Sequence, residues 1–247
     1  MSESTRMGME VSFNVGYLVV VWTLVIAMWR HRHQASPSDE PISRLFLAAF
    51  LLLALGDSGH LGFRLWAYAL GDIEAHVELF GLELCLVGLG ALATAVTVTL
   101  FYVLVQIIWQ RRFRKPYGWL GVVLFGAVLV RFALMIPDAN QWHSVVPPQP
   151  WSIYRNLPLM VQGLGIAYLI LRDASASKDK VFRWVGLLIL ASYAFYMPVI
   201  FFVQRLPVLG MLMIPKTIAY VAIAFISYFH FFRQDAVASQ SRGLATA

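Results

Sequence analysis

Long runs of apolar residues, separated by short polar segments, dominate this sequence. The seven runs cover residues 11–29, 42–68, 79–109, 118–136, 151–171, 181–203 and 209–232. A helix needs about 20 apolar residues to cross the hydrocarbon core of a bilayer. The pattern therefore predicts an all-α, polytopic membrane protein, a seven-transmembrane helix bundle. We expect one domain over residues 1–235 and a disordered cytoplasmic tail at 236–247, where small and polar residues prevail.

Composition supports a membrane protein and excludes other classes. The 247 residues are 60% hydrophobic and only 13% charged, whereas a soluble domain is about 25% charged. This composition excludes a soluble globular enzyme and a disordered chain. Cys85 is the single cysteine of the sequence, so an intramolecular disulfide is excluded as well.

Basic residues follow the first, third, fifth and seventh runs, and the chain carries a net charge of +6. They are Arg30, Arg32 and Arg44, then Arg111, Arg112, Arg114 and Lys115, then Arg172, Lys178, Lys180 and Arg183, and finally Arg233. Cytoplasmic loops carry the excess of Lys and Arg in inserted proteins. This rule predicts the N-terminus outside and the C-terminus in the cytoplasm. No basic face exists outside these loops, so we expect no nucleic-acid partner.

The first run is expected to remain in the mature protein. A signal peptide places its positive charge before the apolar segment, whereas here Arg30 and Arg32 follow it. We therefore count it as the first membrane helix.

Several ionisable and polar side chains interrupt the apolar runs, although such groups are costly inside a membrane. They are Asp57, His60 and Arg64 in the second run, Glu83 in the third, Arg131 in the fourth, Arg155 and Asn156 in the fifth, and Lys216 and Tyr220 in the seventh. At about 1.5 Å per residue, Asp57 and Arg131 lie roughly 20 Å above the cytoplasmic starts of their helices. Glu83, Arg155, Asn156 and Lys216 fall within about 10 Å of the outer ends of their helices. The sequence thus predicts one polar pocket in the extracytoplasmic half of the bundle, roofed by the loop that carries Asn140.

Basic groups outnumber acidic ones in the predicted pocket. The planar guanidinium fork binds phosphate and carboxylate bidentately, so we expect an anionic lipid or a small anion as the ligand. Asp57 and His60 share a helical face, and they are our candidate catalytic pair, a base and its partner.

We expect neither a metal nor a cofactor. His76, His143 and His230 have no partner at the spacing that metal ligands require. A retinal protein would explain a lysine in the seventh run, but Leu212 stands one turn before Lys216, where microbial rhodopsins carry an acidic residue.

Each of these polar groups also has a purely structural interpretation. Asp57 and Glu83 could pair with arginines only to fix helix packing, and Arg64 could reach the outer headgroups. Three functions therefore stay open: an enzyme acting on an anionic lipid, a receptor or transporter for a small extracytoplasmic anion, and a structural assembly protein. Membrane lipids are partners in all three, and the oligomeric state is undetermined.

Four motifs resemble a group of uncharacterised bacterial seven-helix integral membrane proteins. The motifs are Gly56–Leu61 with Arg64, Thr97–Tyr102, Tyr154–Pro158 and Gly210–Thr217, and the segment Pro137–Trp142 matches in part. The chain departs from that pattern at Phe63, where a proline precedes the arginine in the family, and at 137–140, where the family has Pro-Gln-Asn. The resemblance implies a multi-pass protein of the bacterial plasma membrane, and it implies no activity.

Overall fold

The computed structural model describes residues 3–79 and 82–233. Its helices are α1 (Glu3–Arg30), α2 (Glu40–Ala69), α3 (Leu86–Phe113), α4 (Gly118–Met135), α5 (Trp151–Ala176), α6 (Lys180–Phe202) and α7 (Met213–Phe231). Short 3₁₀ turns, η1 (Asp138–Asn140) and η2 (Pro207–Leu212), precede α5 and α7, and strands β1 (His76–Leu79) and β2 (Leu82–Cys85) join α2 to α3. Within these described residues, seven helices are long and apolar enough to cross a membrane. This finding confirms the predicted helical bundle and indicates a multi-pass membrane protein.

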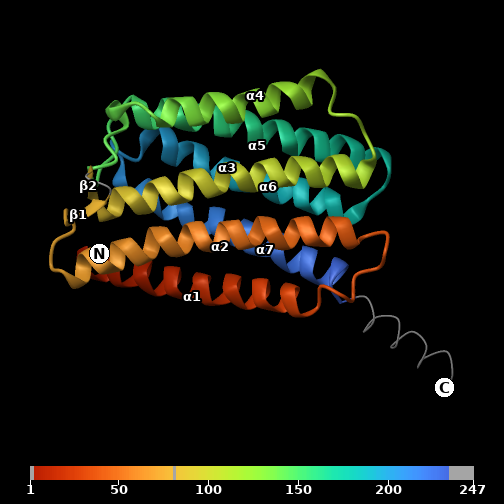
Figure 1. Cartoon of the computed structure of the whole chain (residues 1–247), viewed down its shortest axis with the longest axis horizontal. Helices are drawn as coiled ribbons and strands as arrows, with labels where there is room; N and C mark the ends of the chain where they lie inside the picture. Colours follow the sequence, from red (N-terminus) through yellow and green to blue (C-terminus); the bar gives the residue numbers. More distant parts are fainter. Residues whose placement is uncertain (1–2, 80–81, 234–247) are drawn as a thin grey trace.

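The seven helices run side by side along the long axis of the molecule (Figure 1). The start of α1 and the hairpin of β1 and β2 lie at one end, and the α1–α2, α3–α4 and α5–α6 connections lie at the other. We call these the hairpin end and the basic end, because the second carries Arg111, Arg114 and Lys115. All basic loops of the sequence therefore share one end of the bundle.

The predicted spans overlap all seven helices, but α1 begins earlier than predicted, at Glu3, α5 extends to Ala176, and the third helix begins later than predicted. That span was expected from residue 79, but α3 begins at Leu86, and residues 76–79 and 82–85 form an antiparallel pair. Glu83 was therefore wrongly placed in a helix: it lies in β2, where it pairs with Glu78 of β1. The tail predicted to be disordered, 236–247, lies outside the described residues.

One buried cluster takes side chains from all seven helices. Toward the basic end of this cluster, aromatic rings from different helices meet, with Phe46 of α2 against Phe182 of α6 and Phe231 of α7. Large apolar side chains such as Leu129 and Trp184 are exposed on the outer faces. Because lipid tails solvate such groups, apolar outer faces together with an apolar core are what a membrane bundle requires.

Small residues bring α2 and α3 into close contact. A Cβ atom added at Gly90 of α3 would lie 2.8 Å from the backbone Cα of His60 in α2. The Thr94 hydroxyl donates to the carbonyl of Gly56 across the same interface at 3.1 Å. This contact fixes the height of His60 and its neighbours relative to α3.

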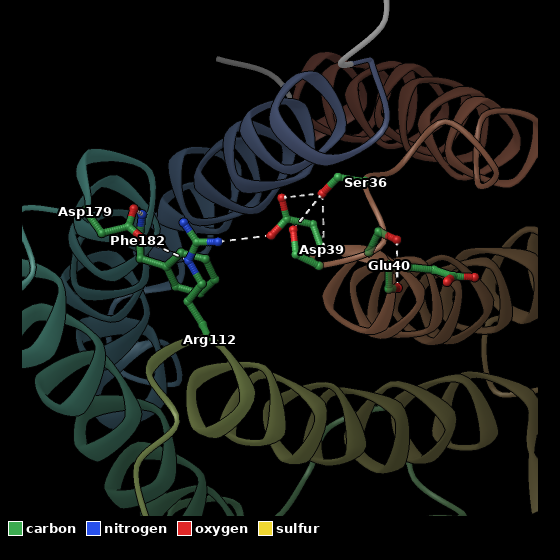
Figure 2. A network of polar contacts seen from close by, with 8 residues as sticks. Ser36, Asp39, Glu40, Arg112, Asp179 and Phe182 are labelled. Atoms are coloured by element: carbon green, nitrogen blue, oxygen red, sulfur yellow. Dashed lines mark hydrogen bonds and ion pairs between the residues drawn. The ribbon is translucent and has the colours of Figure 1, made fainter.

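A polar network joins three segments at the basic end (Figure 2). Arg112 of α3 donates to Asp39, which precedes α2, at 3.1 Å and to Asp179, which precedes α6, at 2.9 Å. Its guanidinium also lies over the Phe182 ring, 5.4 Å from the centroid. One partly buried cation thus ties the α1–α2 and α5–α6 connections to the end of α3.

Candidate functional site

A cavity of about 550 Å³ lies inside the bundle, toward the hairpin end, and every helix contributes to its lining. It brings together most of the polar groups singled out from the sequence: Asp57, His60, Arg64, Arg131, Arg155, Asn156, Lys216 and Tyr220. Apolar side chains, among them Leu53 and Val98, complete the wall. The cavity is large enough for a small molecule or a lipid headgroup.

Arg131 of α4 is the most deeply buried charge of the cavity, with 2% of its surface exposed. Its Nε and Nη1 atoms have no hydrogen-bond partner among the described residues. A buried guanidinium without partners is costly, because it has lost its hydration and gained no acceptor. An anion in the cavity would supply the missing acceptors.

Arg155 of α5 reaches the cavity beside Arg131 and is held by the loop after α4. Its Nη1 donates to Asn140 Oδ1 at 3.4 Å, and its guanidinium lies 4.3 Å from the centre of the Trp142 ring. Asn140 in turn donates to the carbonyls of Leu134 and Pro137. Asn140 was predicted as a ligand residue, but the structure places it behind Arg155, as a support.

Lys216 lies in the first turn of α7, close to two tyrosine rings. Its ammonium is 4.2 Å from the centre of the Tyr196 ring and 5.8 Å from that of Tyr220. Pro215 falls in the same first turn, where a missing backbone N–H breaks no helical hydrogen bond. Lys216 is therefore not needed to repair α7, and its charge remains directed at the cavity.

Asp57 carries the one carboxylate among the described residues of the cavity wall, and this carboxylate already accepts a hydrogen bond. Tyr17 of α1 donates to its Oδ2 at 2.5 Å. No hydrogen bond joins Asp57 to His60 in the described part of the chain, and His60 Nδ1 has no partner there. The two side chains share the cavity without forming a pre-assembled catalytic pair.

Tyrosines that the sequence analysis did not select form a large part of the wall. Tyr193 donates to the carbonyl of Leu159 at 2.8 Å, and the Tyr196 hydroxyl donates to Asn156 at 3.3 Å. Tyr102, which is not among the lining residues, bonds the predicted site residue Tyr220 at 2.6 Å. The search for site residues in the apolar runs selected mainly charged side chains, and a tyrosine carries no formal charge. The signal was a polar face of α6, where Ser192, Tyr193 and Tyr196 recur at helical spacing.

Four basic side chains face one carboxylate among the described lining residues of the cavity. Arg131 and Arg155 present guanidinium forks, and Lys216 adds a point charge. Tyrosine hydroxyls provide further donors around them. Because the helices shield these groups from water, their attraction for an anion is stronger than on an open surface.

Comparison with protein families, with curated proteins and with solved structures finds no match for this chain. Within the described residues, no group of three or more His, Cys, Asp or Glu side chains could hold a metal ion. The fold and the cavity therefore define the class, a multi-pass membrane protein with a basic internal cavity.

Proposed function

We propose that this protein binds an anionic group, either the headgroup of an anionic lipid or a small phosphate or carboxylate, in its internal cavity. The observation that carries the proposal is Arg131, which is buried with two unpartnered nitrogen atoms that an oxyanion would satisfy. Arg155 and Lys216 lie along the same wall and add to the positive field.

The proposal includes the setting of the protein. By the positive-inside rule, the basic end is cytoplasmic, and the cavity then lies in the extracytoplasmic half of a bacterial plasma membrane. All four motifs that resemble bacterial seven-helix proteins, at 56–61, 97–102, 154–158 and 210–217, contribute residues to the cavity wall. Their convergence on one site supports a shared binding function with those proteins.

Binding without chemistry is favoured over catalysis. Asp57 accepts a hydrogen bond from Tyr17, and none joins it to His60 within the described residues. A general base must lie within hydrogen-bond reach of the proton that it takes. Turnover of a lipid by the unmodified protein, lost in Asp57→Asn, would replace the binding function by an enzymatic one.

Arg131→Gln tests the proposal directly. We expect the affinity for inorganic phosphate, or for short-chain phosphatidylglycerol, to fall by about ten- to a hundredfold, because charge-assisted hydrogen bonds are lost. Titration calorimetry on the purified full chain in an uncharged detergent measures this affinity. Arg44→Gln is the matched control, because it removes an arginine whose ion pair with Glu40 is exposed.

A second variant separates binding from a structural role. Without added anion, Arg131→Met should unfold at a higher temperature, since it removes a buried charge that lacks hydrogen-bond partners. It should also lose any stabilisation by the anion. Unchanged anion affinity in Arg131→Gln, or a lower melting temperature in Arg131→Met, would contradict the proposal and favour a structural protein.

A further inference from the structure

A second hollow, of about 460 Å³, lies at the basic end, where the segment before α2 meets the end of α3. We call it the basic groove. Ser38, Pro41 and Ile42 form one wall, and Arg111, Arg114 and Lys115 line the other. All six lie far along the bundle from the internal cavity, so the two sites are separate.

The three cations of the groove are not neutralised by the protein. In the described part of the chain, no hydrogen bond, ion pair or ring contact involves the side chains of Arg111, Arg114 or Lys115. Asp173, whose charge reaches Lys115, is already bonded to Trp109 and Arg172. The groove therefore presents a net positive charge to any ligand.

The neighbouring Arg112 shows the opposite arrangement and keeps the groove in shape. It is bonded to Asp39 and Asp179, as Figure 2 shows, and the Ser36 hydroxyl donates to the same Asp39 at 3.1 Å. This network holds the chain that carries Ser38 and Pro41 against α3. The groove is thus a built feature of the helix ends and does not depend on a free loop.

The depth of the groove corresponds to the headgroup layer of a membrane. The 28 residues of α3 extend over about 42 Å, longer than the hydrocarbon core of about 30 Å. The excess length leaves room for its charged last turn, which carries Arg111, in the polar layer. Trp119, in the first turn of α4, is 78% exposed, as expected for a side chain at the interface.

We propose that the basic groove binds the headgroup phosphate of an anionic phospholipid of the adjacent leaflet. Arg111, Arg114 and Lys115 surround the phosphate, beside Ser38, whose hydroxyl bonds the Ser36 hydroxyl at 3.0 Å. Pro41 and Ile42 contact the glycerol and the first methylenes of the acyl chains. Basic grooves between helix ends are suited to such headgroups, because each cation near the surface adds to the attraction.

The test compares lipid retention in two triple variants of the full chain. Arg111→Gln/Arg114→Gln/Lys115→Gln removes the charges of the groove. Lys178→Gln/Lys180→Gln/Arg183→Gln removes three exposed charges from the α5–α6 connection and the first turn of α6, at the same end. Each protein is placed in nanodiscs of phosphatidylcholine with a minor fraction of phosphatidylglycerol, and native mass spectrometry counts the phosphatidylglycerol that each retains.

We expect the groove variant to lose phosphatidylglycerol affinity by more than about tenfold and the control to change by less than about threefold. Neither variant alters the internal cavity, so any lipid bound there is common to both. Equal losses would show a diffuse electrostatic effect, and equal retention would show no site; either result overturns the proposal. Stabilisation of the unmodified protein, but not of the groove variant, by inorganic phosphate without lipid would assign the groove to a soluble ligand and also overturn it.

Discussion

At the scale of single residues, the pocket depends on which charges are left without partners. Arg112 and Arg131 are both arginines within or at the end of an apolar helix. Arg112 is neutralised by Asp39 and Asp179, whereas Arg131 is buried with two nitrogen atoms unsatisfied by the described residues. The sequence shows where each arginine lies along its helix. It does not show which of the two has acidic partners, because such partners come from distant segments of the chain.

Asn140 is expected to act as a positioning residue for Arg155. In Asn140→Ala, the carbonyls of Leu134 and Pro137 lose their donor, and Arg155 loses the oxygen that orients it. Each buried polar group left without a partner lowers the free energy of unfolding by about 1–3 kcal/mol at most. We expect a lower melting temperature and a weaker phosphate affinity, measured by thermal unfolding and calorimetry.

Ser144→Ala is the matched control for Asn140→Ala. The Ser144 hydroxyl also donates to a loop carbonyl, that of Val146, but in an exposed position. Its loss should change stability by less than about 0.5 kcal/mol. Equal effects of the two substitutions would show that Asn140 has no special role in holding Arg155.

At the scale of elements, the sequence predicted helices well and the hairpin not at all. An apolar run long enough to cross the membrane begins at residue 79, so the predicted helical span included the residues that form β2. Residues 76–79 and 82–85 alternate between polar and apolar side chains in part, a period-two pattern that favours strands. Such short segments are ambiguous in the sequence, and pairing between β1 and β2 decides their structure.

The close contact of α2 and α3 can be tested at Gly90. Gly90→Ala would push a Cβ against the backbone of His60, which cannot rotate away. We expect a loss of about 1–3 kcal/mol, as for other overpacked positions, together with weaker anion binding as α2 shifts. Thermal unfolding and phosphate titration measure the two effects.

Gly62→Ala provides the control on the partner helix. A Cβ there meets nothing within 4 Å, so the change should be neutral or slightly stabilising, by up to about 1 kcal/mol. If Gly90→Ala were equally harmless, the separation of α2 and α3 would not be set by this glycine.

At the scale of the whole molecule, the alternation of charge between loops sets the expected orientation. In a chain in which Cys85 is replaced by serine, a cysteine at Val146 should react with a membrane-impermeant maleimide in intact cells. A cysteine at Ser177, at the basic end, should react only after the cells are opened. This pattern follows from the cost of moving a cluster of cations across the membrane.

Mass spectrometry of the labelled proteins measures the reaction, and both positions are exposed in the structure. Labelling of the Ser177 cysteine in intact cells would reverse the proposed orientation. The cavity would then face the cytoplasm, and its ligand would come from that side.

The sequence by itself determined the number and approximate bounds of the helices and the shared end of the basic loops, and it placed Asp57, Arg131 and Lys216 at one end of the bundle, where they line the same cavity. These properties follow from local periodicity, because in lipid the backbone must satisfy its own hydrogen bonds and a helix of given length has a given reach. Only the tertiary structure decided that Tyr17 engages Asp57, that Asn140 lies behind Arg155, and that Arg131 is left without a described partner. These contacts join residues on different helices, and their geometry depends on how the whole bundle packs.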